Sequence, residues 1–186
     1  MPWNVLPDLA VLGITASSPT PVNQVVKISK DLVPDLWNPT GEVIEQAIFR
    51  LLGDGLVVAS DHQGAPDHLY VTAGGRDRLR RLLCFDPGYM TSPATLAVEA
   101  VQFRFLDVAD SDTTDQVLNR LRGRIERRRD ELKRRCKAQP AQGRFANLWM
   151  TMEQLRLTEM ARLMALIGRE AGPDGGPAPA ATEAAI

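Results

Sequence analysis

Apolar residues recur at helical spacing along most of the chain, and one stretch combines this pattern with two short strands. Apolar positions follow one another at intervals of three or four between Thr40 and Asp54, which predicts a helix with one buried side. These positions are Val43, Ile44, Ala47, Ile48, Leu51 and Leu52. Gly55 can adopt the left-handed conformation that ends a helix. Leu56 to Val58 and Leu69 to Val71 then predict two strands around a turn-rich segment, 61–67.

Further helices are predicted on both sides of this helix and hairpin. Apolar spacing predicts helices from about Leu6 to Ala16 and from Pro21 to Leu32, separated by a Ser- and Pro-rich break. Asn38 or Thr40 is expected to cap the third helix, and Thr72 to cap a fourth. Three helices followed by a two-stranded hairpin are the layout of a winged helix-turn-helix.

The second half of the chain is predicted to be helical throughout. One helix is expected from Pro93 to Val108, a second is capped by Ser111 or Asp112, and a third runs from Arg144 to Arg169. The last helix has an apolar stripe too wide for one contact surface, so we expect it to contact its own domain and a second chain. Its predicted dimerisation residues are Phe145, Leu148, Trp149, Met152, Leu155, Met160, Leu163 and Ile167.

The predicted fold is therefore mainly α with a small β-hairpin. Residues 1–87 are assigned to a winged helix-turn-helix DNA-binding domain and 92–170 to an antiparallel helical dimerisation domain. The low-complexity segment 171–186 cannot supply a core and is predicted to be a disordered tail.

Charge is distributed unevenly although the whole chain is close to neutral. From Met1 to Gly75 there are 3 Lys and Arg against 8 Asp and Glu, a net charge of −5. From Arg120 to Lys137 there are 10 against 3, a net charge of +7. This basic run has three interpretations: a phosphate-binding face, a solvated helix side, or a surface that pairs with the acidic half of a partner chain.

Other sequence features limit the cellular compartment and the kinds of reaction that we expect for this protein. No apolar run spans a bilayer and no signal segment opens the chain, so we expect a cytoplasmic protein with no membrane association. Cys84 and Cys136 are then expected to be reduced thiols. We find no nucleophile–base pair and no glycine-rich phosphate loop, and both histidines, His62 and His68, lie near the predicted wing. The chain is therefore predicted not to be an enzyme, and to bind neither cofactor nor metal.

Several segments together resemble the PadR family of transcriptional regulators, over roughly Pro7 to Ile167. The first helix, LAVLGI at 9–14, resembles that family's opening helix, and FRLLGDGLV at 49–57 resembles the end of its recognition helix. LYVTAGGR at 69–76 resembles its wing strand and the following helix start. The resemblance implies a homodimeric repressor that binds double-stranded operator DNA, and a small aromatic effector as a further partner.

If the third helix enters a major groove, its outward side chains meet the base edges. Gln46 can pair with adenine, Arg50 with guanine or a phosphate, and Glu45 with cytosine. The predicted DNA-binding residues are Lys27, Lys30, Asn38, Thr40, Glu45, Gln46, Phe49, Arg50, Gln63 and His68.

Three positions depart from the family pattern and keep a second hypothesis open. Glu45 stands where the family usually has Tyr, Phe49 where a Lys is common, and Pro21-Val22-Asn23 where it has a His-Gly-Tyr-like stretch. The alternative is a winged-helix interaction module that has lost DNA binding, whose acidic third helix binds a basic protein.

Overall fold

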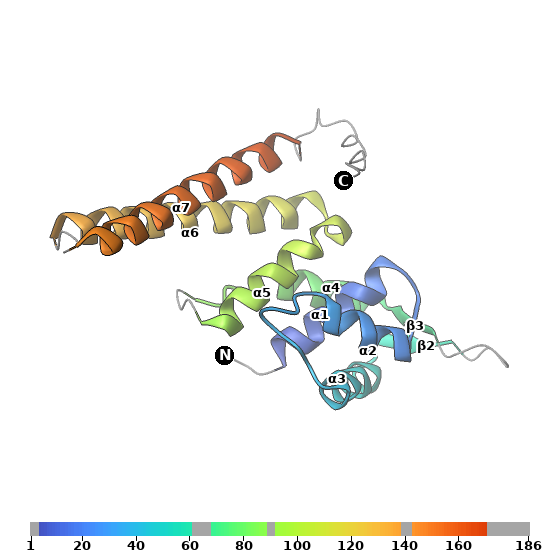
Figure 1. Ribbon diagram of the computed structural model, residues 1–186. Coiled ribbons are helices and arrows are strands. Elements are labelled where there is room, and N and C mark those ends of the chain that lie inside the picture. The colour runs from blue at the N-terminus through green and yellow to red at the C-terminus, as the bar shows by residue number, and fades with distance from the viewer. Residues whose placement is uncertain (1–3, 61–67, 89–91, 139–142, 171–186) are drawn as a thin grey trace, which may run out of the picture. The chain divides into compact units, whose positions relative to one another are not determined.

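The computed structural model describes residues 4–60, 68–88, 92–138 and 143–170. Most of these residues are helical, and the strands form one small antiparallel sheet (Figure 1). The predicted fold class is therefore confirmed. The chain divides into two compact units, Met1–Thr114 and Asp115–Ile186.

The first unit has the topology of a winged helix. Its elements are α1 (Val5–Ser17), β1 (Thr20–Pro21), α2 (Val22–Asp31), α3 (Gly41–Gly53), β2 (Val57–Ala59), β3 (His68–Val71), α4 (Ala73–Leu83), α5 (Pro93–Arg104) and the 3₁₀ helix η1 (Leu106–Val108). The first three helices end within one residue of their predicted bounds. Gly55 has φ +66°, as expected for the residue that follows a helix.

The sheet has three strands where the sequence predicted two. Its order is β1-β3-β2, with Thr20 opposite Leu69 and Val58 opposite Tyr70. The segment that contains β1 was interpreted only as a break, because two residues carry no detectable alternation. Pro21 has no amide proton to donate to a ladder, and β1 lies at the sheet edge, where that loss is tolerated.

Two predicted helix caps are corrected. Thr40, rather than Asn38, is the N-cap residue of α3, but its side chain accepts no capping hydrogen bond from the helix amides. The helix α6 (Ser111–Ala138) is capped by Asp110, whose Oδ1 accepts from the Thr113 amide at 2.8 Å, rather than by Ser111 or Asp112. The cap at α4 is confirmed, because Thr72 Oγ1 accepts from the Gly75 amide at 3.1 Å.

The core of the first unit surrounds α1. Every α1 residue from Pro7 to Thr15 is buried, and α1 packs against α2, α3, α4, α5 and β3. The helix lies in the middle of these elements in Figure 1. A helix that is apolar on nearly all sides is expected at the centre of a domain rather than at its surface.

Helix α5 belongs to the first unit, although the sequence assigned it to a dimerisation domain starting at 92. Its Val98 and Val101 are fully buried, and Gln102 Nε2 donates to the carbonyls of Leu82 and Phe85 at 2.8 Å each. The unit boundary consequently falls between Thr114 and Asp115, inside α6, rather than between 87 and 92. Periodicity alone could not reveal this, because it does not show which surface a helix packs against.

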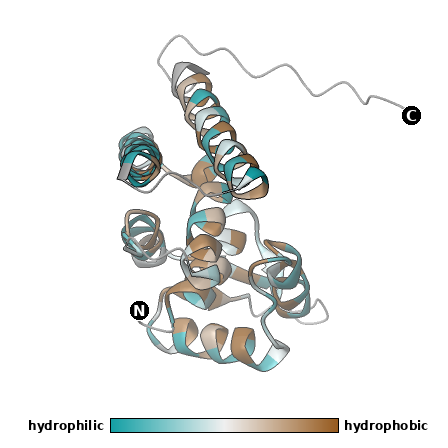
Figure 2. Cartoon of the chain, turned by 60° about the vertical axis from the view of Figure 1, so that its left-hand side comes forward, coloured by the Kyte–Doolittle hydropathy of each residue, from teal (hydrophilic) through white to brown (hydrophobic). Residues whose placement is uncertain are grey.

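The second unit is a helical hairpin formed by α6 and α7 (Arg144–Glu170). Arg122 Nη2 donates to the Met164 carbonyl at 2.9 Å, and Gln154 Nε2 contacts Cys136 Sγ at 3.5 Å, so the two helices run antiparallel. Polar and apolar residues alternate along α7 in Figure 2. None of the helices in the described ranges is long and apolar enough to cross a bilayer. The predicted tail, 171–186, lies outside the described residues.

We predict that Gly75→Ala destabilises the first unit by roughly 1–3 kcal/mol, the usual cost of overpacking. A Cβ at Gly75 would lie 2.0 Å from the Leu56 carbonyl oxygen, and backbone cannot rotate aside as a side chain can. Gly53→Ala is the control, since a Cβ there meets nothing within 4 Å. Urea unfolding followed by circular dichroism measures both. Equal stability of the two variants would show that α4 does not pack this closely on the Leu56 backbone.

Candidate nucleic-acid interface

Helix α3 exposes one side of its surface, as its apolar spacing predicted. Ile44, Ala47, Ile48 and Leu51 are buried on the inner side. Glu42, Glu45 and Gln46 are exposed on the outer side, and Phe49 is 73% exposed. The Phe49 ring is therefore accessible to another molecule, although a single exposed ring does not by itself mark an interface.

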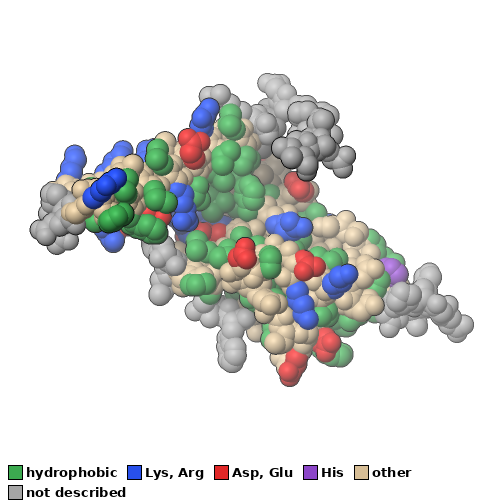
Figure 3. Space-filling model, in the orientation of Figure 1, with side chains coloured by type: hydrophobic (Ala, Val, Ile, Leu, Met, Phe, Trp, Pro, Cys, Tyr) green, Lys and Arg blue, Asp and Glu red, His purple; other side chains and the backbone are tan. Residues whose placement is uncertain are grey.

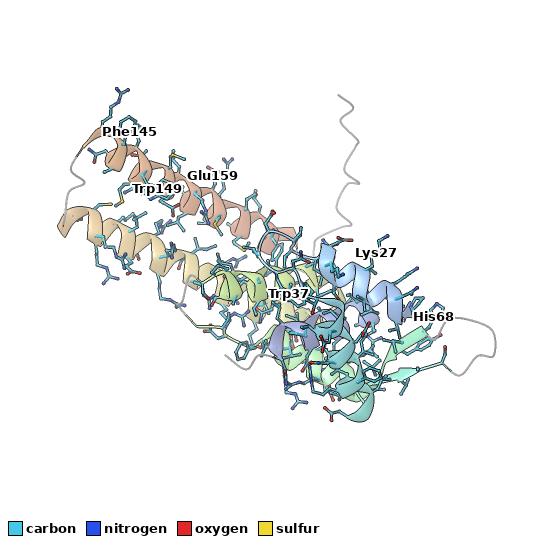
Figure 4. All side chains as sticks on the ribbon, turned by 60° about the horizontal axis from the view of Figure 1, so that its bottom comes forward. Lys27, Trp37, His68, Phe145, Trp149 and Glu159 are labelled. Atoms are coloured by element: carbon cyan, nitrogen blue, oxygen red, sulfur yellow. The ribbon has the colours of Figure 1, made fainter. Side chains whose placement is uncertain are left out.

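The other predicted DNA-binding residues lie around α3 in the same unit. Lys27 and Lys30 are exposed on α2, which packs against α3. Asn38 and Thr40 are exposed on the segment that enters α3. His68 is half-buried at the start of β3, on the wing, and Figure 4 labels it together with Lys27. Gln63 lies outside the described residues.

Arg50 is bound within the protein rather than presented outward. Its Nη2 forms a short ion pair with Asp8 Oδ1, and Arg78 Nη2 lies 3.9 Å from Asp8 Oδ2. Asp8 thereby joins α1 to both α3 and α4. Whether Arg50 contacts DNA stays a prediction, but its charge is already opposed by a carboxylate.

Burial raises the pKa of Asp8 above its ordinary value, although the hydrogen bond and charge of Arg50 and the charge of Arg78 act in the opposite direction. The Asp8 side chain is only 6% exposed, whereas Arg50 and Arg78 keep 33% and 37% of theirs exposed. The carboxyl is thus the desolvated member of the group. The sequence analysis did not identify Asp8 as a functional or structural residue. The signal that could have identified it is the presence of an acid within the otherwise apolar run of α1.

The exposed side of α3 is acidic. Gln46 Nε2 donates to Glu42 Oε1 at 3.3 Å, so part of the hydrogen-bonding capacity of Gln46 is already used. With Arg50 engaged by Asp8, the charges left on this side are Glu42 and Glu45. On the face of this unit that Figure 3 shows, acidic and basic side chains lie close to each other and form no continuous positive area. Lys27 and Lys30 supply exposed positive charge on α2, which packs against α3.

One pocket of about 200 Å³ lies in the first unit, away from α3. Its lining residues are Arg76, Leu79, Arg80, Leu83, Val108, Ala109, Asp110 and Thr113. Arg80 Nε pairs with Asp110 Oδ2 across it at 3.1 Å. Within the described ranges, no three His, Cys, Asp or Glu side chains are grouped to hold a metal ion.

The chain was compared with known proteins. No family model matches it, and no curated protein does. Among solved structures it is similar to Bacillus subtilis PadR in complex with operator DNA, at 13% identity and a TM-score of 0.40, over 89% of this chain and 98% of that one. Membership of the PadR family therefore stays a prediction, and the winged-helix assignment rests on the strand order and helix packing described above.

We predict that Arg50→Met destabilises the first unit by about 2 kcal/mol at pH 8. Breaking a fully buried ion pair costs roughly 3–5 kcal/mol, and partial exposure of Arg50 and Arg78 reduces this through solvent screening. Removing Arg50 raises the pKa of Asp8 further, so the neutral carboxyl is favoured in the folded state. The loss is then largest above the folded pKa and shrinks as the pH falls towards 5. Urea unfolding at both pH values measures it.

The double variant Arg50→Met with Asp8→Asn is the control for this pH dependence. It lacks the titrating carboxyl, so its stability relative to the wild type should not recover at low pH. A loss in Arg50→Met that is the same at pH 5 and pH 8 would show that Asp8 does not carry the effect.

Proposed function

We propose that this protein is a dimeric winged-helix transcriptional regulator that represses by binding operator DNA. The observation that supports it most directly is the winged-helix topology, with α3 exposed beside the lysines of α2. In such domains the third helix enters the major groove while neighbouring elements contact phosphates. Phe49, Gln46 and Glu45 are the side chains of α3 that would reach base edges, and Lys27 and Lys30 those that would reach the backbone.

The dimer in this proposal is formed through α7. This helix has two apolar sides: Leu157, Met164 and their neighbours are buried or half-buried in the hairpin with α6, and the opposite side is exposed. The exposed side comprises Phe145, Leu148, Trp149, Met152, Leu155, Met160, Leu163 and Leu166, while Ile167 is half-buried. Phe145 is 82% and Trp149 62% exposed. An exposed apolar side of this extent marks an interface with another molecule, and a second copy of α7 matches it in length and character.

The dimer gives the regulator its geometry. Two α3 helices must lie about 34 Å apart to enter successive major grooves on one face of a duplex. A dimer formed through α7 would set that spacing, and a small aromatic effector that repacked its helices would change the affinity for DNA.

A second candidate function follows from the charge of α3. Its exposed carboxylates repel phosphates, and Asp8 engages its arginine, as described above. These features favour a module that binds a basic protein segment instead of DNA. The two functions differ in the sign of the partner's charge, so charge variants of α2 and α3 distinguish them.

We predict a salt-dependent gel shift with the DNA upstream of this protein's own gene, weaker at 200 mM than at 50 mM salt. Lys27→Gln with Lys30→Gln should weaken binding by roughly tenfold if two phosphate contacts are lost. Glu42→Gln with Glu45→Gln should strengthen binding to an unrelated duplex, because it removes repulsion from α3. No shift at 50 mM salt with either duplex would refute the proposal, and weaker binding of a basic protein by the α3 variant would favour the interaction module.

We predict that Leu155→Glu with Leu163→Glu separates the protein into monomers, since it introduces charges into the exposed side of α7. The dimer dissociation constant should rise at least about hundredfold, equivalent to about 2.7 kcal/mol. Thr158→Glu is the matched control, because Thr158 is exposed on the polar flank of the same helix. Sedimentation velocity measures association and circular dichroism confirms that the helices persist. A wild-type protein that is monomeric at tens of micromolar would contradict the proposal.

A further inference from the structure

We propose that α6 carries a second DNA-contacting surface, formed by Lys133, Arg134 and Lys137, which binds the phosphate backbone. We call this surface the α6 basic face. The inference rests on the proposed function, since it identifies where a DNA-binding form of this protein obtains its electrostatic attraction.

The charge balance of the two units provides the first argument. Residues 1–114 contain 8 Lys and Arg against 14 Asp and Glu, a net charge of −6. Residues 115–186 contain 14 against 9, a net charge of +5. Duplex DNA carries about one negative charge per 1.7 Å, and neutralising its phosphates supplies most of the non-specific affinity. The winged-helix unit has the wrong sign for this role, whereas the helical unit has the right one.

The pairing of individual side chains provides the second argument. Lys133, Arg134 and Lys137 are all exposed, and none of them pairs with a carboxylate of the described residues. Arg134 Nε donates to the Asp130 backbone carbonyl at 3.4 Å, and Arg134 forms no ion pair with a described carboxylate. Arg135 differs, because it forms an ion pair with Glu131. The surface therefore consists of cations that form no ion pair with a carboxylate in the part of the chain that the structure describes.

The spacing of these residues provides the third argument. At about 100° per residue, positions 133, 134 and 137 fall within an arc of roughly 100° on the helix. Arg134 lies on the opposite side of the helix from Ile125, Leu132 and Cys136, which pack in the hairpin, and Lys133 and Lys137 lie on the flank between the two sides. Asp130 shares the arc, and the net charge of the face remains positive. These three cations lie within little more than one turn of the helix. Their flexible ends suit adjacent phosphates, which need charge rather than a shaped pocket.

Lysine footprinting tests this inference and the proposed function separately. The chain has four lysines: Lys27 and Lys30 on α2, and Lys133 and Lys137 on α6. The full-length protein is acetylated with an N-hydroxysuccinimide ester, with and without a 30-base-pair duplex, and each lysine is quantified by mass spectrometry. We expect the duplex to slow acetylation of Lys133 and Lys137 at least threefold.

Each outcome of the footprinting experiment bears differently on the inference and on the proposed function. Protection of Lys27 and Lys30 without Lys133 and Lys137 overturns the inference and leaves the proposed function intact. Protection of the α6 lysines alone supports the inference and removes α2 from the interface. No protection at all, together with no binding, overturns both. Lys133 and Lys137 could also be acetylated slowly, and at the same rate with and without DNA. That result would mean that another part of the protein covers the α6 basic face, and it would also overturn the inference.

The salt dependence of binding gives an independent test. Each phosphate contact contributes about −0.9 to the slope of log affinity against log salt, so losing one contact reduces the change between 50 and 200 mM salt about threefold. Lys133→Gln, Arg134→Gln and Lys137→Gln combined should flatten the slope by one or more contacts per protomer. Lys133→Arg, Arg134→Lys and Lys137→Arg combined keeps the charge and should keep the slope. Equal slopes for the two triple variants would overturn the inference.

Discussion

The winged-helix unit depends on the burial of α1. This helix has almost no exposed surface from Pro7 to Thr15, and four other helices and the central strand of the sheet all pack on it. Close packing on all sides requires small residues where neighbours approach. A Cβ at Gly13 would lie 2.3 Å from the ring of Phe105, so the position of η1 relative to α1 requires glycine there. The orientation of α3 follows from the same arrangement, because its buried side packs on α1.

Asp8 adds an ion pair with defined geometry to the apolar packing of helices on α1. Apolar surfaces tolerate small rotations of one helix against another, whereas an ion pair has a defined partner and geometry. The Asp8 carboxylate, carried by α1, faces Arg50 of α3 and Arg78 of α4. Desolvation raises the pKa of Asp8, and the hydrogen bond and charge of Arg50 and the charge of Arg78 oppose this rise. This arrangement engages, in an ion pair with Asp8, an arginine that the sequence assigned to DNA, although a third of its side chain stays exposed.

The sequence allowed the elements and the fold class to be predicted, but not the partners of individual side chains. Helix α3 and the hairpin were identified because apolar spacing and Gly55 report local conformation directly. The strand β1 was missed because two residues have no period, and α5 was assigned to the wrong unit because its apolar residues do not reveal their packing partner. Arg50 illustrates the same limit: its helical position points partly outward, and only the fold shows that Asp8, 42 residues earlier, is within reach.

The separation of charge between the units changes what the winged helix must supply for DNA binding. A recognition helix needs base contacts for specificity, but affinity for phosphates can come from any part of the assembly that reaches the duplex. In this chain the exposed side of α3 carries Phe49, Gln46 and two carboxylates. These groups favour discrimination between base sequences over attraction to phosphates. Carboxylates near bases also disfavour non-specific binding, since they repel every phosphate and accept hydrogen bonds only from particular bases such as cytosine. The proposed division of labour, with specificity on α3 and attraction on α6, would reconcile an acidic winged helix with the DNA duplex that we propose as its partner.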